Sequence, residues 1–156
     1  MQTRSWREYT DIESMKHGRY AHGCGYSTAS NATYVCGGES STSQDIKQCE
    51  VLTSDGSWQL SGIMGISRTA RPIVTEIMTP DGPRITVVGG RDTNGNVLKS
   101  TEIMELDGEF SAGTSLPVGL AMAAGVALKD STYIFGGESE NGLSARVLKW
   151  RIPDTV

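Results

Sequence analysis

Few residues in this chain are suited to catalysis or metal binding, and their spacing limits what they can do. His17 and His22 are the only histidines, and Cys24, Cys36 and Cys49 are the only cysteines. A zinc site needs several such ligands at set spacing, and the sequence contains no cluster of that kind. With two histidines there is also no legible Ser–His–Asp arrangement. We therefore expect no catalytic residue, no metal site and no cofactor, unless scattered acidic side chains converge in the fold.

Two short polar motifs suggest chemistry of another kind. Asn31-Ala32-Thr33 has the form of an N-glycosylation acceptor and stands where a hairpin turn is expected. Asp92, Asn94 and Asn96 alternate like the first half of a calcium-binding loop, but the glycine and the glutamate that complete such a loop are missing. We interpret the second motif as a polar loop. The first favours an extracellular setting.

Composition and charge exclude several classes of partner. The chain has 156 residues, enough for one domain with a real core, and its formal net charge is −4. Nucleic-acid phosphates favour a basic face, so we expect no nucleic-acid partner. No apolar run is long enough to span a membrane. The first seven residues lack the apolar stretch of a signal peptide, which leaves the compartment open.

The elements that must position these residues are β-strands. The chain contains 19 glycines, and they come as doublets beside runs rich in Val, Ile and Tyr. Long helical periodicity is absent, because Gly, Pro, Asn-Gly or Asp-Gly interrupts every longer stretch. The composition therefore predicts an all-β fold.

Three segments repeat one pattern, an apolar strand that ends in Gly-Gly. The doublets are Gly37-Gly38, Gly89-Gly90 and Gly136-Gly137, with 52 residues between the first two starts and 47 between the last two. A period near 50 residues indicates a repeat architecture. A phosphate-binding loop would instead need a helix start after the glycines, and polar turn residues follow here.

Other residues keep step with the doublets. Arg19 and Arg71 each precede the first glycine of a doublet by 18 residues, and Glu50 and Glu102 each follow the second glycine by 12. An aromatic residue, Trp58 or Phe110, lies eight residues after each glutamate. In the third unit Leu120 takes the arginine position and Lys149 the glutamate position.

Together these features resemble the kelch repeat, over nearly the whole chain. The resemblance implies four-stranded antiparallel blades of a β-propeller, each with strands a to d from the channel outward. It makes strand b the strand that ends in Gly-Gly, where glycine lets backbones approach closely. Strand c carries the glutamate and strand d the aromatic residue. Arg19-Tyr20-Ala21-His22 matches the Arg-x-x-His start of strand a, and we interpret His22 as a structural residue.

The blades follow one another within a single kelch-repeat region, residues 1–156. A strand d is predicted at 4–10 around Trp6, followed by blades at 19–60, 71–111 and 120–153. The order is therefore d-(abcd)-(abcd)-abc, which is half of a β-propeller. Such a half exposes apolar faces and open edges. We expect a homodimer, or other blades elsewhere, to complete a six-bladed ring.

The strand assignment brings two cysteines together. If strands b and c are antiparallel neighbours, Cys36 and Cys49 face each other at a distance suited to a disulfide. Their spacing also resembles that of secreted invertebrate kelch proteins. Two buried free thiols in a cytosolic protein are the alternative. The cysteines and the glycosylation motif both slightly favour an extracellular over a cytoplasmic location.

Function is expected from the architecture. Kelch-like propellers commonly bind partner proteins through the loops between strands, so we expect a non-catalytic protein–protein interaction scaffold. Four arginines stand in or beside such loops and could bind carboxylates: Arg19, Arg68, Arg71 and Arg91. Each of them could equally pair with a nearby acid of the chain itself. The alternatives are a propeller enzyme of the mutarotase, lyase or oxidase type acting at the channel mouth, or a self-assembling structural half-propeller.

Overall fold

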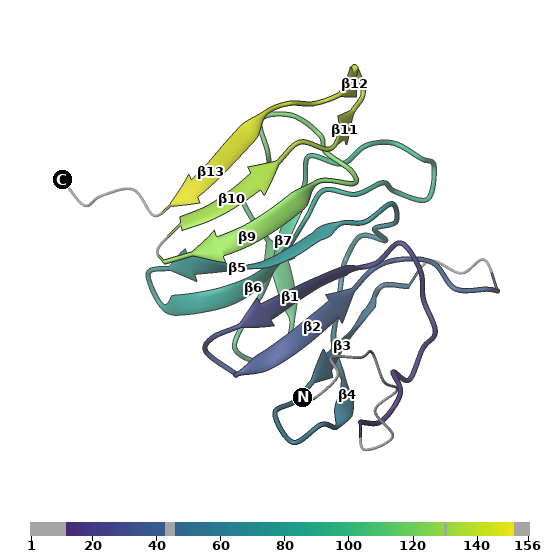
Figure 1. Ribbon diagram of the computed structural model, residues 1–156, viewed down its shortest axis with the longest axis vertical. Coiled ribbons are helices and arrows are strands. Elements are labelled where there is room, and N and C mark those ends of the chain that lie inside the picture. Colours follow the sequence, from purple (N-terminus) through teal and green to yellow (C-terminus); the bar gives the residue numbers. More distant parts are fainter. Residues whose placement is uncertain (1–11, 43–45, 130, 152–156) are drawn as a thin grey trace, which may run out of the picture.

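The described chain consists of antiparallel β-sheets joined by turns and loops (Figure 1). The computed structural model describes residues 12–42, 46–129 and 131–151. This confirms the all-β class. The strand predicted at residues 4–10 lies outside the described residues. Within the described part, no helix is long and apolar enough to cross a membrane.

Each Gly-Gly repeat corresponds to one sheet built from consecutive strands. The first sheet has the order β1 (Gly23–Ser27), β2 (Ala32–Cys36), β3 (Gln48–Leu52) and β4 (Trp58–Ile63). The second has the order β5 (Ile73–Thr79), β6 (Gly82–Val88), β7 (Thr101–Met104) and β8 (Phe110–Ala112).

The third sheet contains three strands in the described residues. Its order is β9 (Ala124–Leu128), β10 (Ser131–Phe135) and β13 (Val147–Arg151). A separate small hairpin, β11 (Glu138–Ser139) with β12 (Gly142–Leu143), lies in the loop between β10 and β13.

The three sheets stand side by side, with β1 against β5 and β5 against β9 (Figure 1). One apolar cluster lies between the first two sheets and contains Val74, Val87 and the two half-cystines Cys36 and Cys49. A second cluster, between the second and third sheets, is centred on Ile73, Val88, Leu120 and Ile134. These two clusters are the core that holds the sheets together.

Close approach of neighbouring strands depends on glycine at one face of the first sheet. A Cβ atom added to Gly25 would lie 2.4 Å from the backbone oxygen of Val74 in β5. Atoms cannot come that close, so the packing of β1 on β5 requires the missing side chain.

The sheets have two distinct ends. The turns that join β1 to β2 and β5 to β6 lie on the left in Figure 1, beside the end of β9 and the start of β10, and we call this the hairpin end. The long connections on the right form the loop end. These connections run from the last strand of one sheet to the first of the next, and from the second strand of each sheet to its third.

The Gly-Gly doublets tie the loop end together, as their pattern predicts. Gly38 donates its N–H to the carbonyl of Arg68, and Gly90 donates to that of Leu120, at 2.9 and 2.8 Å. A Cβ atom on Gly37 would lie 2.4 Å from the Arg68 oxygen, and one on Gly89 would lie 2.2 Å from the Leu120 oxygen. The first two doublets thus hold the connections that enter the second and third sheets.

Candidate functional site

A buried ion pair organises the loop end between the first and second sheets. Arg68 is fully buried, and its Nε and Nη2 both donate to Oε1 of Glu102, at 3.1 and 3.0 Å. Nη1 donates to the carbonyls of Gly89 and Ser100, and Nη2 also donates to the Ser100 hydroxyl. All five N–H donors of a guanidinium are therefore used. Burial lowers the pKa of Arg68, and the Glu102 carboxylate opposes that shift.

The same arrangement recurs at the first sheet. Nη2 of Arg19 donates to Oε1 of Glu50 at 2.6 Å, and both side chains are fully buried. Nη1 of Arg19 donates to the carbonyls of Gly37 and Gln48. Glu50 also accepts the N–H groups of Lys16 and His17, just as Glu102 accepts those of Gly65 and Ile66.

The third sheet replaces this ion pair by two leucines. Leu120 is fully buried and packs with Leu148 in the second apolar cluster. In sheet register Leu148 pairs with Ile134, as Glu102 pairs with Val87. Pro117 precedes Leu120 by three residues, as Gly65 precedes Arg68, and proline has no N–H to donate. Proline thus removes one of the two backbone donors that the carboxylate accepts in the second sheet.

These contacts correct the alignment made from the sequence. Arg19 corresponds to Arg68 and not to Arg71, because both make the same carbonyl and carboxylate contacts. The second repeat has three more residues than the first between this arginine and the doublet, which shifts the count. One is in the connection, because Thr69 precedes the start of β5 by four positions and Tyr20 precedes the start of β1 by three. The other two are in the longer hairpin of β5 and β6. Likewise Leu148, not Lys149, holds the glutamate position.

The four arginines proposed as binding residues fall into two groups. Arg19 and Arg68 are enclosed and their charged groups are paired within the chain, so these two are corrected to residues that hold the loops in place. Arg71 is exposed at the loop end. Arg91 is partly exposed and forms an ion pair with Glu138 at 3.0 Å.

Exposed side chains gather on the loop end above the buried pairs. The Tyr20 hydroxyl donates to Glu39 at 2.8 Å, a contact that raises the pKa of Tyr20. Met122 is 56% exposed on the corresponding connection of the third sheet. We call the following residues the loop-end surface: Tyr20, Glu39, Arg71, Arg91, Met122 and Glu138.

Backbone hydrogen bonds link the three tips of this surface. Arg71 donates its N–H to the Ala21 carbonyl at 2.8 Å, and Met122 donates to the Ala70 carbonyl at 3.0 Å. Ala21, Arg71 and Met122 have φ angles of 52°, 54° and 53°, in the left-handed region that residues other than glycine rarely adopt. Such backbone persists only where its surroundings fix it, so the tips are held in defined positions.

His22 lies half-buried beside this surface. Burial lowers the pKa of His22, and the positive charge of Arg19 lowers it further. The imidazole is therefore neutral near pH 7, and the interpretation of His22 as a structural residue remains a prediction.

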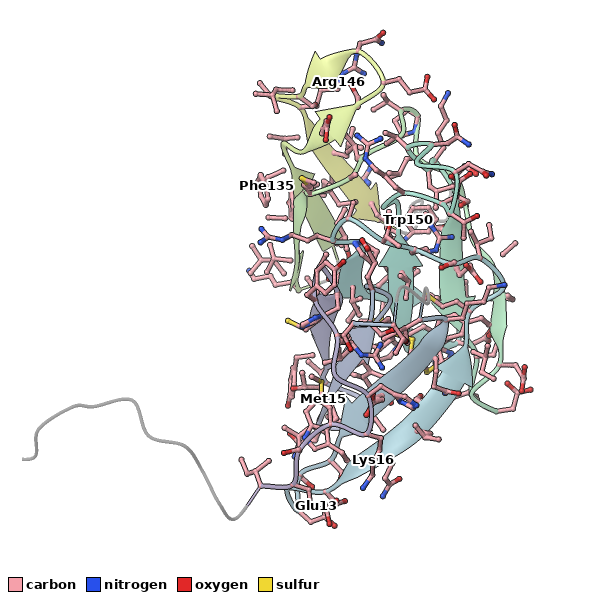
Figure 2. All side chains as sticks on the ribbon, turned by 90° about the vertical axis from the view of Figure 1, so that its right-hand side faces the viewer. Glu13, Met15, Lys16, Phe135, Arg146 and Trp150 are labelled. Carbon is pink, nitrogen blue, oxygen red and sulfur yellow. A yellow bond between two sulfur atoms is a disulfide. The ribbon has the colours of Figure 1, made fainter. Side chains whose placement is uncertain are left out.

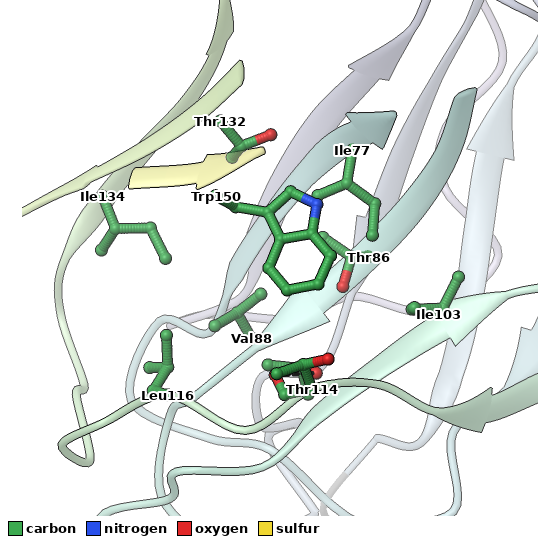
Figure 3. Close-up of a pocket in the computed structure, with 10 residues that line it drawn as sticks. Ile77, Thr86, Val88, Ile103, Thr114, Leu116, Thr132, Ile134 and Trp150 are labelled. Carbon is green, nitrogen blue, oxygen red and sulfur yellow. Dashed lines mark hydrogen bonds between the residues drawn. The ribbon is translucent and has the colours of Figure 1, made fainter. Parts of the chain in front are cut away.

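A small apolar cavity of about 50 Å³ lies between the second and third sheets (Figure 3). Trp150 forms one wall, and its buried indole N–H has no hydrogen-bond partner among the described residues. Thr86, Thr101 and Thr132 also line it, but each hydroxyl donates to a backbone carbonyl. Because these three hydroxyls are already bonded to the backbone, the cavity offers space for apolar packing rather than groups for catalysis.

Cys36 and Cys49 form a disulfide, with their Cα atoms 4.3 Å apart. It joins β2 to β3 at the position where Val88 pairs with Thr101 in the second sheet. Cys24 is free and exposed. Among the described residues, no three His, Cys, Asp or Glu side chains are grouped so that they could hold a metal ion.

The fold is similar to that of YjhT, a protein of known structure. The two structures share a TM-score of 0.73 at 15% sequence identity over 91% of this chain. The chain spans 45% of the length of that protein. No protein-family model and no curated protein sequence matches the chain. At this identity the likeness concerns the fold alone.

Proposed function

We propose that this chain is a non-catalytic protein–protein interaction module, built from kelch-like propeller blades, that binds its partner through the loop-end surface. The observation that carries the proposal is that, at the loop end, buried and paired residues hold the connections while other residues of the same connections are exposed. Below, paired Arg–Glu groups and glycine contacts fix the connections. Above, exposed Tyr20, Arg71 and Met122 are displayed on tips of defined conformation.

The residue types support binding. Tyrosine, arginine and methionine are enriched in protein interfaces, and tyrosine and arginine dominate their binding energy. A surface that is rigid before binding loses little conformational entropy when a partner docks. Arg91 and Glu138 already pair with each other, so they would form the polar rim around these three residues.

Affinity capture with matched variants tests this proposal. Wild-type protein is used as bait in extracts of its source, beside Tyr20→Ala, Arg71→Ala and the hairpin-end control Arg84→Ala. We expect capture of the partner to fall at least about tenfold for the two loop-end variants, which corresponds to a hot-spot residue, and to persist for the control. Equal capture by all four proteins would refute the loop-end surface as the binding site.

Self-assembly is a second candidate function, favoured by the outer face of the third sheet. All five residues of β9 are exposed, and apolar side chains continue across β10 and β13. Phe135 points away from the second sheet, on the side of the third sheet opposite Trp150 (Figure 2). The exposed apolar residues of this outer face are Val126, Leu128, Phe135 and Val147, between 44% and 60% exposed.

The repeat indicates what would cover that face. Gly38 and Gly90 each bind the connection that enters the next sheet, but the Gly137 N–H has no acceptor among the described residues. The carbonyls of Arg68 and Leu120 accept the N–H groups of Gly38 and Gly90. Arg19 is the residue of the first sheet that corresponds to Arg68 and Leu120. A second copy would therefore offer its Arg19 carbonyl to Gly137, and two such contacts related by a two-fold axis would complete a six-bladed ring.

The cavity at Trp150 supports the same arrangement. In the second sheet Met104 pairs with Phe110 of the fourth strand, and this ring packs toward the first sheet. Trp150 holds the place of Met104 in the third sheet, and β13 has no further strand beside it in the described residues. An added strand that carries an aromatic residue would fill the cavity. Native mass by sedimentation decides this second candidate, since the mass of one chain would exclude it.

A further inference from the structure

Asn31 is the only asparagine of this chain that meets the acceptor rule for N-glycosylation. The others are Asn94, Asn96 and Asn141, and none of them has Ser or Thr two residues later. Asn31 is followed by Ala32 and Thr33, so a serine or threonine stands at the required position and no proline intervenes.

The structure places this asparagine at an accessible turn. Asn31 is exposed and lies at the hairpin end, immediately before β2. Its φ of 50° lies in the left-handed region, which asparagine adopts more readily than most residues. Gly82 and Lys129 stand at the turns of the other two sheets, also with positive φ. The turn alone explains a residue such as Asn or Gly here, but it does not explain the threonine at position 33.

The side-chain amide is available for modification. The hydroxyl of Tyr26 donates to Oδ1 of Asn31 at 2.6 Å. Nδ2, the atom that carries the sugar in N-linked glycans, makes no hydrogen bond within the described residues. A glycan attached there would extend from the tip of the turn without breaking a contact of the fold.

An independent feature places the chain in a suitable environment. The Cys36–Cys49 disulfide forms and persists in oxidising compartments, which include the endoplasmic reticulum. N-glycans are attached in that same compartment. We propose that Asn31 is an N-glycosylation site, and that its oligosaccharide covers the hairpin end and leaves the loop end open.

The reaction needs a co-reactant of defined class, a lipid-pyrophosphate-linked oligosaccharide. Nδ2 of Asn31 forms a bond to the anomeric carbon of the first sugar, and the bond between that carbon and the pyrophosphate oxygen breaks. The lipid pyrophosphate leaves with the electron pair of that bond, and Nδ2 loses one proton. Thr33 contributes the hydroxyl that makes the segment an acceptor.

Expression of the full chain behind a cleavable secretion leader in animal cells tests the site. The readout is the intact mass before and after treatment with a peptide-N-glycosidase, measured on both secreted and cell-associated protein. We expect a glycan mass on the wild type that the enzyme removes. Because the glycan is added before folding is complete, a chain that is retained in the cell still reports it. A wild type of unmodified mass in both fractions would overturn the proposal.

Matched variants separate the acceptor from the turn. In Asn31→Gly the new residue tolerates the left-handed backbone as asparagine does, so the turn is kept. Thr33→Val removes the acceptor hydroxyl and keeps the branched shape. We expect both variants to lack the glycan. Thr33→Ser keeps the acceptor and should keep the glycan. Tyr26→Phe removes the hydrogen bond to Oδ1 and should also keep it. A glycan that remains on Asn31→Gly would place the modification elsewhere and refute the assignment.

Discussion

Glu102 accepts the backbone N–H groups of Gly65 and Ile66 and the guanidinium of Arg68, so one carboxylate holds three residues of the connection into the second sheet. Glu102 is a residue of β7, and Arg68 belongs to the loop that precedes β5. The pair therefore joins two parts of the chain that are 34 residues apart. The pair recurs in the first sheet as Arg19–Glu50 and is replaced by two leucines in the third.

Removing one member of the Arg68–Glu102 pair should destabilise the protein strongly. Arg68→Leu leaves a buried carboxylate, and Glu102→Leu leaves a buried guanidinium, each at a cost of about 3–5 kcal/mol. The double variant restores the apolar pairing that Leu120 and Leu148 make in the third sheet. We expect it to unfold at a higher denaturant concentration than either single variant.

Denaturant unfolding of the four proteins forms a double-mutant cycle. The double variant still leaves the Gly65 and Ile66 N–H groups without their acceptor, so recovery should be partial. Adding Gly65→Pro, which copies Pro117, removes one of those donors and should recover more. If the double variant loses the sum of the two single losses, the two charges are not coupled and this account of the pair fails.

The disulfide should contribute measurably to stability. Cys36 and Cys49 are 13 residues apart, and closing a loop of that size in the unfolded chain is worth about 3 kcal/mol. Cys36→Val with Cys49→Thr copies the residues of the second sheet at the same positions. We expect a lower unfolding midpoint for this double variant in non-reducing buffer.

Reducing agent provides the matched control for the disulfide. The wild type should lose stability when a reductant is added, whereas the Cys36→Val, Cys49→Thr variant should not respond. Cys24→Ser should behave as the wild type does, because Cys24 is a free, exposed thiol. Equal midpoints for the wild type with and without reductant would contradict a structural role for the bridge.

Acid should weaken the fold through Glu50. Burial raises the pKa of Glu50, but the hydrogen bonds from Arg19, Lys16 N–H and His17 N–H outweigh it, and the pKa lies below its ordinary value of 4.5. The ionised form is therefore favoured by folding. Its contribution is present above pH 4.5 and is lost as the pH falls through the lower folded-state pKa.

Comparison of the wild type with Glu50→Gln isolates this group from the other acids. At neutral pH the variant should be less stable, because the buried Arg19 loses its counter-charge. As the pH falls below the ordinary glutamate pKa, the difference in unfolding free energy between the two proteins should shrink. A difference that is constant between pH 7 and about pH 3 would show that the Glu50 pKa is not lowered.

Much of this fold could be predicted from the sequence, because the repeated features are local. The strand that ends in Gly-Gly predicts one sheet per repeat. The strand assignment implied by the resemblance placed Cys36 opposite Cys49, with two free thiols as the alternative, and the structure contains the disulfide. Glu50 and Glu102 could be placed in equivalent strands from their spacing. The division of the chain into propeller blades and the closure of those blades into a ring remain predictions.

The site could not be read from spacing, because three additional residues in the second repeat shifted the arginine count. Counting back from the doublets selected Arg71, whereas the buried counterpart of Arg19 is Arg68. The same shift affects the predicted strand at residues 4–10: Trp58 precedes Arg68 by ten residues, and the residue ten before Arg19 is Tyr9, not Trp6. Pro117 could have indicated the correct alignment. It stands where Gly65 donates its N–H to Glu102 in the second sheet, and the third sheet has no glutamate to accept such an N–H.

β1 and β5 pack closely at the contact between the first two sheets. Gly25 lies in β1, where an added Cβ would come within 2.4 Å of the Val74 oxygen and 2.7 Å of its carbonyl carbon. Both atoms belong to the backbone of β5, so they can move only if the strands separate. We expect Gly25→Ala to lower the free energy of unfolding by about 1–3 kcal/mol, the usual cost of overpacking.

Gly18→Ala is the matched control for this close approach. No atom lies within 4 Å of the Cβ position at Gly18, and its backbone is outside the left-handed region. Its stability should therefore stay within about 0.5 kcal/mol of the wild type, as for most surface substitutions. Thermal and denaturant unfolding of the two variants measure the difference. If both substitutions have the same small effect, β1 and β5 do not pack at the distance described, and the contact between the first and second sheets must be looser.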